Sequence, residues 1–186
     1  MRKTDLINLK LGENNLKMKT RMKQIDDLVT KTTEFFCGDG KRIQHFIKVY
    51  TYSALIGRLE NLDDKTQDIL EAAAVVHDVG IKPAEEKYGY NNGKLQEELG
   101  PAEAEVLLAA TGYSDSQIER IIYLVGHHHT YNNIDGMDYQ ILVEADFLVN
   151  LQEEESSEQV IRNVYEKIFK TRSGKKLCSD IFGLKM

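Results

Sequence analysis

The chain has 186 residues, which suits one domain of ordinary size and is too short for two comfortable ones. With 41% apolar and 29% charged residues, it has the composition of a globular protein that buries a core. Its net charge of −6 argues against a nucleic-acid polymer or an anionic membrane as partner, because both favour a basic surface. No CxxC motif joins Cys37 and Cys178, so we expect reduced thiols and no cysteine zinc site.

The sequence shows no candidate for a membrane span or for a signal peptide. No apolar run approaches the roughly 20 residues of a membrane span, and the segment 1–19 sustains no apolar core of signal-peptide length. We therefore expect a cytoplasmic protein without a membrane partner.

Helical periodicity predominates from the start of the chain, and strand alternation is hard to find. The apolar spacing predicts a first helix over residues 15–36, with Met18 and Met22 in the core. A second helix is predicted over residues 42–60. A third, which Asp63 or its neighbour can cap, runs to about residue 79.

The middle of the chain contains a long polar stretch, residues 82–100. Loops of this length are uncommon in compact domains and tend to be functional or to contain a short helix. Pro101 suits the first turn of a fourth helix, and Gly112 suits its end. Ser114, with Gln117 three residues later, predicts a capping box at the start of a fifth helix.

The last third of the chain is also predicted to be helical. A sixth helix covers residues 137–154, and its acidic end, Glu153–Glu155, is expected to be solvated. One of the serines 156–157 caps a seventh helix, and the sequence SGKK at 173–176 ends it before a short C-terminal segment. The predicted fold class is therefore all-α, a compact multi-helix bundle without a separate second domain.

The five histidines of the chain are not scattered. They are His45, His77, His127, His128 and His129. The first is beside an apolar stripe, the second ends the apolar run Ala72–Val76 and is followed by Asp78, and the last three form one block. Burying an imidazole next to a carboxylate is costly unless each finds a partner. Asp146 is similarly out of place inside the apolar segment 141–151.

A metal ion would be a common partner for these groups. Adjacent residues on a helix point about 100° apart, so His77 and Asp78 can reach one ion only where the helix ends, and Gly80 helps there. His45 could supply a third ligand and Asp146 a fourth. Two imidazoles and two carboxylates suit a six-coordinate divalent ion such as iron, manganese, cobalt or magnesium. Two positions would remain for water and a phosphoryl oxygen.

In this order, His45, the HD pair at 77–78 and Asp146 within EAD resemble the H…HD…D pattern of the HD superfamily. Its members are all-α, metal-dependent phosphohydrolases. The resemblance covers about residues 41–152, as the core of one HD-type domain over 1–186 with the terminal helices packed on it. It implies that His45, His77, Asp78 and Asp146 are metal ligands.

Some HD families bind a second ion through additional histidines. This chain has Gln96 and Glu97 where the first of these histidines would fall, so the number of bound ions, one or two, is left open. Three consecutive helical side chains fan over about 200°, so at most two of the three block histidines can face one site. We favour His128 as the one nearest the phosphate or a second ion, with a neighbour assisting. The alternative is a partly exposed helix end where cationic histidine meets the helix dipole.

Lys82 could hold a phosphate as a point charge, or it could be a solvated lysine. We expect Lys82 and His128 at the rim of a cleft beside the metal, and we assign them, with Asp78, to catalysis.

The predicted function is a metal-dependent phosphohydrolase that cleaves a phosphate ester of a small molecule or nucleotide by attack of a metal-bound water. One alternative is a sensor module that keeps the HD fold and the metal site without turnover. A weaker alternative is a di-iron oxygenase. A small phosphorylated substrate is the expected partner, and the oligomeric state is left open.

Overall fold

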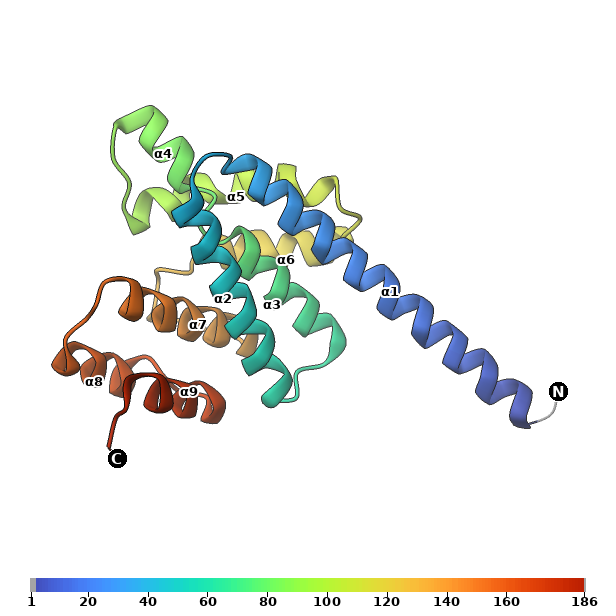
Figure 1. Cartoon of the computed structure of the whole chain (residues 1–186). Coiled ribbons are helices and arrows are strands. Elements are labelled where there is room, and N and C mark those ends of the chain that lie inside the picture. The colour runs from blue at the N-terminus through green and yellow to red at the C-terminus, as the bar shows by residue number, and fades with distance from the viewer. Residues whose placement is uncertain (1–2, 186) are drawn as a thin grey trace.

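The structure is a computed structural model that describes the backbone of residues 3–185 and the side chains of residues 12, 16 and 18–185. Residues 1–2 and 186 of the expected domain, 1–186, lie outside the described residues. Over the described range the chain forms nine helices and no strand, which confirms the all-α prediction (Figure 1). The helices are α1 (Lys3–Phe35), α2 (Gly40–Leu59), α3 (Asp64–Val76), α4 (Ile81–Tyr88), α5 (Gly93–Ala109), α6 (Asp115–Val125), α7 (Met137–Glu153), α8 (Glu158–Lys167) and α9 (Arg172–Phe182).

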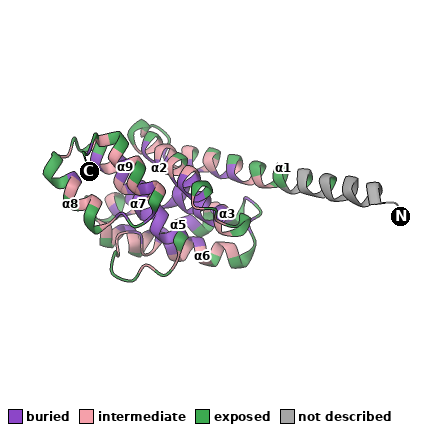
Figure 2. Ribbon diagram, turned by 90° about the horizontal axis from the view of Figure 1, so that it is seen from below, coloured by how far each residue is buried: buried purple, intermediate pink, exposed green. Residues whose placement is uncertain are grey.

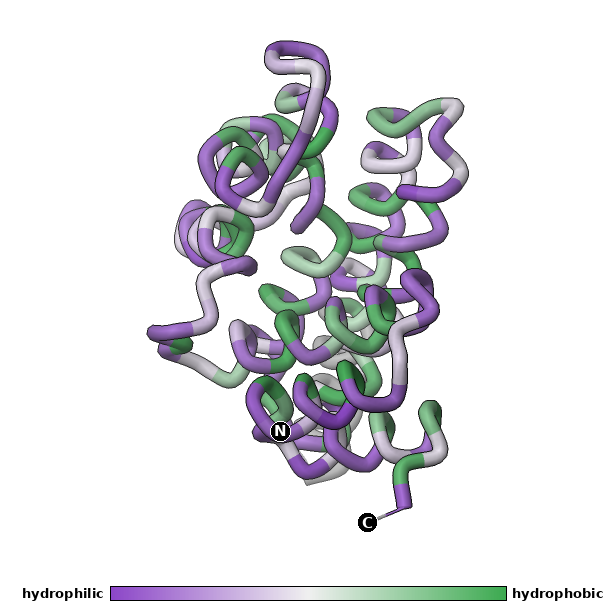
Figure 3. Tube along the Cα trace, turned by 90° about the vertical axis from the view of Figure 1, so that its left-hand side faces the viewer, coloured by the Kyte–Doolittle hydropathy of each residue, from purple (hydrophilic) through white to green (hydrophobic). Residues whose placement is uncertain are grey.

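Two helices form the centre of the bundle. Apart from Asp68, every residue of α3 from Gln67 to Val76 is buried, and α3 packs against α1, α2, α6 and α7. The segment Asp138–Asp146 of α7 is buried without interruption. Figure 2 shows this buried interior, and Figure 3 shows hydrophobic residues on the inner sides of the helices and hydrophilic ones on the outer turns. His77, which follows α3, and Asp146, inside α7, are therefore buried in the protein.

Helix α1 joins the bundle only through its C-terminal half. Leu28 is fully buried there, whereas the N-terminal half extends away from the other helices (Figure 1). Met18 and Met22 are 56% and 58% exposed, so the prediction that they lie in the core is wrong. Their spacing suits burial, but the bundle ends before it reaches them. None of the described helices is long and apolar enough to cross a bilayer.

The polar stretch 82–100 contains two helical segments. It holds α4 and the first turns of α5, so the prediction that a helix starts at Pro101 is wrong. Asn92 caps α5 instead, because its Oδ1 accepts from the N–H of Leu95 at 3.0 Å. Pro101 lies inside α5, where its ring fits against Gly126: a Cβ there would be 3.2 Å from the proline Cγ. Packing between α5 and the end of α6 thus accommodates the proline within the helix.

The SGKK sequence does not break a helix. It lies inside α9, whose first turn is capped by Thr171: its Oγ1 accepts from the N–H of Gly174 at 2.9 Å. A Cβ on Gly174 would overlap the buried carboxylate of Glu144 on α7. The glycine is therefore explained by close packing between two helices, which local sequence cannot reveal.

Candidate metal centre

The HD pair follows α3 directly, in the turn to α4. Helix α3 ends at Val76, three residues earlier than predicted, so His77 and Asp78 are at a helix end as the metal interpretation requires. Gly80 holds this turn against α5. A Cβ on Gly80 would be 2.5 Å from the carbonyl oxygen of Gln96, so only glycine permits the approach.

The four predicted ligands converge on one point. The Nε2 of His45, from α2, is 3.2 Å from Oδ1 of Asp146 and 3.5 Å from Oδ2 of Asp78. The Nε2 of His77 is 3.4 Å from Oδ2 of Asp78 and 3.6 Å from Oδ1 of Asp146. The predicted convergence is confirmed. That these side chains bind an ion stays a prediction.

Three buried histidines share the same tautomer. In each, Nδ1 donates to an oxygen that can only accept, so Nδ1 carries the hydrogen and Nε2 is the lone-pair nitrogen of the neutral ring. The pairs are His45 with Oε2 of Glu153 at 3.0 Å, His77 with the carbonyl of Ala74 at 2.9 Å, and His128 with the carbonyl of Val125 at 2.8 Å. All three Nε2 atoms are buried without a hydrogen-bond partner among the described residues.

The carboxylates and imidazoles of this cluster shift one another's proton affinities. Burial lowers the pKa of His77, but Asp78 and Asp146 outweigh it and place the pKa well above its ordinary value. Burial raises the pKa of Asp78, but His77 and His128 outweigh it and place the pKa well below its ordinary range. Protons and a divalent cation would therefore compete for the same lone pairs, because both neutralise two buried carboxylates.

His128 lies inside the cluster, so the expectation that it is at the rim is wrong. Its side chain is 1% exposed, and its Nε2 is 3.6 Å from Oδ1 of Asp78. Its ring is perpendicular to that of His77, with centroids 5.3 Å apart. Asp78 therefore faces two groups of donors, with Oδ2 toward His45 and His77 and Oδ1 toward His128.

The other two histidines of the block have different surroundings. The ring of His127 stacks on Tyr123 at 4.2 Å, and its Nδ1 bonds the carbonyl of Tyr123 at 2.7 Å. The Nε2 of His129 donates to Oε1 of Gln96 at 2.6 Å. Burial and the neighbouring His128 lower the pKa of His129 to about 4, so its ring is neutral near pH 7. His129 lines the pocket described below, and His127 does not.

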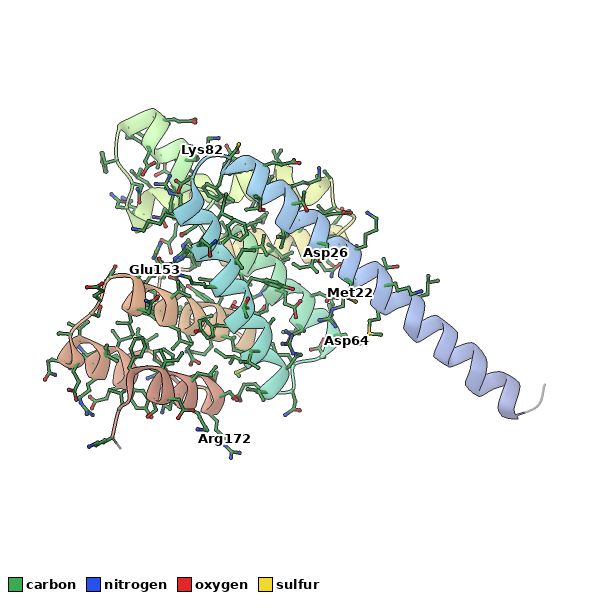
Figure 4. All side chains as sticks on the ribbon, viewed as in Figure 1. Met22, Asp26, Asp64, Lys82, Glu153 and Arg172 are labelled. Carbon is green, nitrogen blue, oxygen red and sulfur yellow. The ribbon has the colours of Figure 1, made fainter. Side chains whose placement is uncertain are left out.

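Lys82 does not lie at the rim of the site, so that prediction is wrong. Its Nζ donates to the carbonyl of Phe35 at 2.9 Å and is 4.9 Å from the centroid of the Phe35 ring. Figure 4 shows Lys82 beside the C-terminal end of α1, away from Glu153. The carbonyls that end a helix carry partial negative charge and attract a cation. Lys82 therefore connects α4 to α1.

The structure brings two residues to the site that the sequence prediction missed. The Nδ2 of Asn150 donates to Oδ1 of Asp146 at 2.9 Å. Glu153 bonds His45 and also accepts from Nζ of Lys48 at 3.0 Å, so it is not solvated as expected. These residues follow Asp146 by four and seven positions and share its face of α7. That spacing was the available signal.

A cavity of about 420 Å³ opens above the cluster. It is lined by Asp39, Lys41, Arg42, His45, Asp78, Ile81, Asn91, Gln96, His129, Asp146, Asn150, Glu153 and Glu154. Three predicted ligands, His45, Asp78 and Asp146, are on its floor. The cluster is thus buried yet reachable from outside.

The side chains present fit a divalent cation. Two groups of three residues each offer ligand atoms that all lie within 4.8 Å of one another: His45 with His77 and Asp146, and Asp78 with His128 and His129. Neighbouring donors around a six-coordinate ion with bonds of about 2.1 Å are about 3 Å apart, close to the 3.2–3.6 Å separations between the cluster's nitrogens and oxygens. Mixed nitrogen and oxygen donors suit iron, manganese or cobalt, whereas a closed zinc site typically uses thiolates.

The fold and this cluster define an all-helical protein with a buried histidine–aspartate centre under an open pocket. The family model of the HD domain matches residues 42–165, more than half of the chain, and the protein belongs to that family. The matched range includes all four predicted ligands.

Among solved structures, the chain is similar to a crystal structure described as a predicted HD superfamily hydrolase from an uncultured Thermotogales bacterium. The two share 22% sequence identity with a TM-score of 0.62, and the match covers 85% of this chain and 84% of that one. The likeness shows that the fold is shared. No curated protein matches the chain.

Proposed function

We propose that the protein is a metal-dependent phosphohydrolase that cleaves a phosphate ester of a small molecule. The observation that carries the proposal is the set of three buried, unpaired Nε2 atoms of His45, His77 and His128 that meets two carboxylates at the base of an open pocket. Burying such groups is costly unless a cation completes them. Membership of the HD domain family and the likeness to a predicted HD superfamily hydrolase support the proposal.

In this proposal His45, His77, Asp78 and Asp146 hold the ion, and His128 is close enough to add a donor. A divalent ion held there supplies a water of lowered pKa and polarises a phosphoryl oxygen. The protein's own part is orientation. The three Nδ1 hydrogen bonds fix each ring so that its lone pair faces the centre, and Asn150 holds the Asp146 carboxylate.

The pocket residues would position the ester. Gln96 and Asn91 bond each other, with Nε2 of Gln96 3.1 Å from Oδ1 of Asn91, and Gln96 also holds the ring of His129. These hydrogen-bonded side chains form a polar wall beside the cluster. An ester held against such a wall loses little further freedom before it reacts, which lowers the barrier by proximity.

The test is a panel of phosphate esters assayed with manganese or iron. We expect phosphate release by the parent protein, its loss after chelation, and its absence in Asp78→Asn. Asp180→Asn, an exposed carboxylate on α9, is the matched control and should retain full turnover. A protein that binds metal but releases phosphate from no ester would contradict the proposal and favour the sensor alternative. Oxygen consumption by a di-iron form would favour the oxygenase.

A further inference from the structure

Most residues that line the pocket above the cluster are polar or charged. Among its lining residues only Ile81 is apolar, and none is phenylalanine, tyrosine or tryptophan. Nucleobases are commonly held by stacking on aromatic side chains, and drug-like ligands by apolar walls. The described residues that line this pocket therefore offer a base no phenylalanine, tyrosine or tryptophan ring and only one apolar side chain.

The charge of the pocket disfavours a polyphosphate. Five carboxylates and two cationic side chains line it, a formal charge of −3 with neutral histidines, and a divalent ion would leave −1. Arg42 is already engaged, since its Nη1 is 2.7 Å from Oδ2 of Asp39 and its Nη2 is 2.6 Å from Oε1 of Glu85. Lys41 is the one lining cation without an ion pair among the described residues. The negative charge that remains repels each further phosphate, so a triphosphate chain is disfavoured more strongly than a single phosphoryl group.

The same walls suit hydroxyl groups. Ionised carboxylates only accept hydrogen bonds, and each can accept about four. Asp39 and Glu153 therefore keep acceptor capacity beyond their present partners, and Glu154 has no side-chain partner among the described residues. The side-chain carbonyl of Asn150 is a further acceptor. Hydroxyls of a sugar or polyol donate to such acceptors.

We infer that the substrate is a monophosphate ester of a small polyhydroxylated molecule, such as a sugar or polyol phosphate, and not a nucleotide. The inference rests on the proposed phosphohydrolase function, because it assigns the substrate class of the same site.

A matched series of probes tests separately whether the site rejects a nucleobase and whether it rejects a polyphosphate. Ribose 5-phosphate, adenosine monophosphate and adenosine triphosphate share one ribose 5-phosphate unit, and each adds a single element, first a base and then two phosphates. With metal in excess over each probe, we measure kcat/KM for cleavage of the 5-phosphate ester, which releases phosphate or, from adenosine triphosphate, triphosphate, and the shift in Tm at equal probe concentration. We expect ribose 5-phosphate to be the best in both, and adenosine triphosphate to be at least roughly tenfold worse in kcat/KM.

A charge reversal at the pocket wall tests the electrostatic part. Glu154→Lys should narrow the gap between adenosine triphosphate and ribose 5-phosphate by roughly fivefold at low ionic strength. Glu155→Lys is the matched control, since it makes the same charge change at a neighbouring residue that does not line the pocket, and it should narrow the gap less than Glu154→Lys does. Circular dichroism and unfolding curves show that both variants fold.

The outcomes distinguish this inference from the proposed function. Preference for ribose 5-phosphate in both measurements supports both. Stabilisation by ribose 5-phosphate without phosphate release overturns the proposed function but supports the pocket assignment. Preference for either nucleotide in both measurements overturns the inference while the hydrolytic function stands. If no probe binds and no probe is cleaved, both the inference and the proposed function are overturned.

Discussion

His45 and Glu153 are 108 positions apart in the sequence, and Nδ1 of His45 donates to Oε2 of Glu153 across 3.0 Å. The same carboxylate accepts from Lys48 at 3.0 Å, one turn further along α2. Burial raises the pKa of Glu153, but the bonds from His45 and Lys48 outweigh it and lower the pKa below its ordinary value. Glu153 thus remains ionised and keeps the lone pair of His45 turned toward Asp146.

Replacing Glu153 by alanine should weaken metal binding without removing any ligand. Carboxylates that orient a ligating histidine typically contribute 10- to 100-fold to metal affinity, and we expect a loss of that order. Competition with a fluorescent chelator measures it. Glu155→Ala is the control and should bind metal as the parent does. Equal affinity in Glu153→Ala would show that the hydrogen bond does not support the site.

The histidine block offers a comparison between adjacent positions. His128→Ala should weaken metal binding and reduce turnover, because its buried Nε2 faces Asp78. His127→Ala should affect neither, because that ring stacks on Tyr123 outside the cluster. Calorimetric metal titration of both variants checks this. Equal behaviour of the two variants would mean that burial of His128 reflects packing alone.

Lys82 should matter for stability and not for turnover. Lys82→Met leaves the carbonyl of Phe35 without its charged donor, and we expect the free energy of unfolding to fall by about 1–2 kcal/mol. Lys94→Met, an exposed position on α5, should cost little. Urea unfolding and kcat/KM are measured together. A variant of parental stability with impaired turnover would return Lys82 to the catalytic site.

Asp68 gives the free energy of unfolding a pH dependence that is separate from the metal centre. Burial raises the pKa of Asp68 to about 6, and the neighbouring Arg21 guanidinium only partly offsets it. The folded state holds this proton more tightly than the unfolded one, so the stabilising contribution of the Asp68 proton is full below about pH 4 and is lost as the pH rises through 6. Asp68→Asn has no such titration. Its free energy of unfolding should therefore rise relative to that of the parent by about 2 kcal/mol between pH 4 and pH 7.

Chemical unfolding at several pH values tests that expectation, with Asp64→Asn as the control. Asp64 also contacts Arg21, but its side chain is 99% exposed. A difference between Asp68→Asn and the parent that stays constant with pH would show that Asp68 titrates normally.

Much of the fold followed from local signals. Asp63 caps α3, since its Oδ1 accepts from Lys65 and Thr66, and Gln117 bonds the N–H of Ser114 at the start of α6. Such caps depend on neighbours within four residues, so the sequence reveals them. The predictions of a helix start at Pro101 and of a helix break around Gly174 were wrong, because each residue lies inside a helix where it packs closely against another element. Packing partners that are distant in sequence decide such positions.

The site divides in the same way. His45, His77, Asp78 and Asp146 were recognisable because polar groups in apolar segments need a partner. The burial of His128 could not be predicted. Helix α6 ends at Val125 and the three histidines follow in a turn, so the helical spacing of side chains does not apply to them. Lys82 was misplaced because its partner is the end of α1, 47 residues away. These positions depend on where elements end and what they meet.

Elemental analysis of protein purified without chelator or added metal shows whether this cluster holds a divalent ion. We expect at least one divalent ion per chain in the parent and in Asp180→Asn, and none above background in Asp78→Asn. A parent protein that contains no metal, and that takes up neither manganese nor iron when these are supplied, would contradict this expectation.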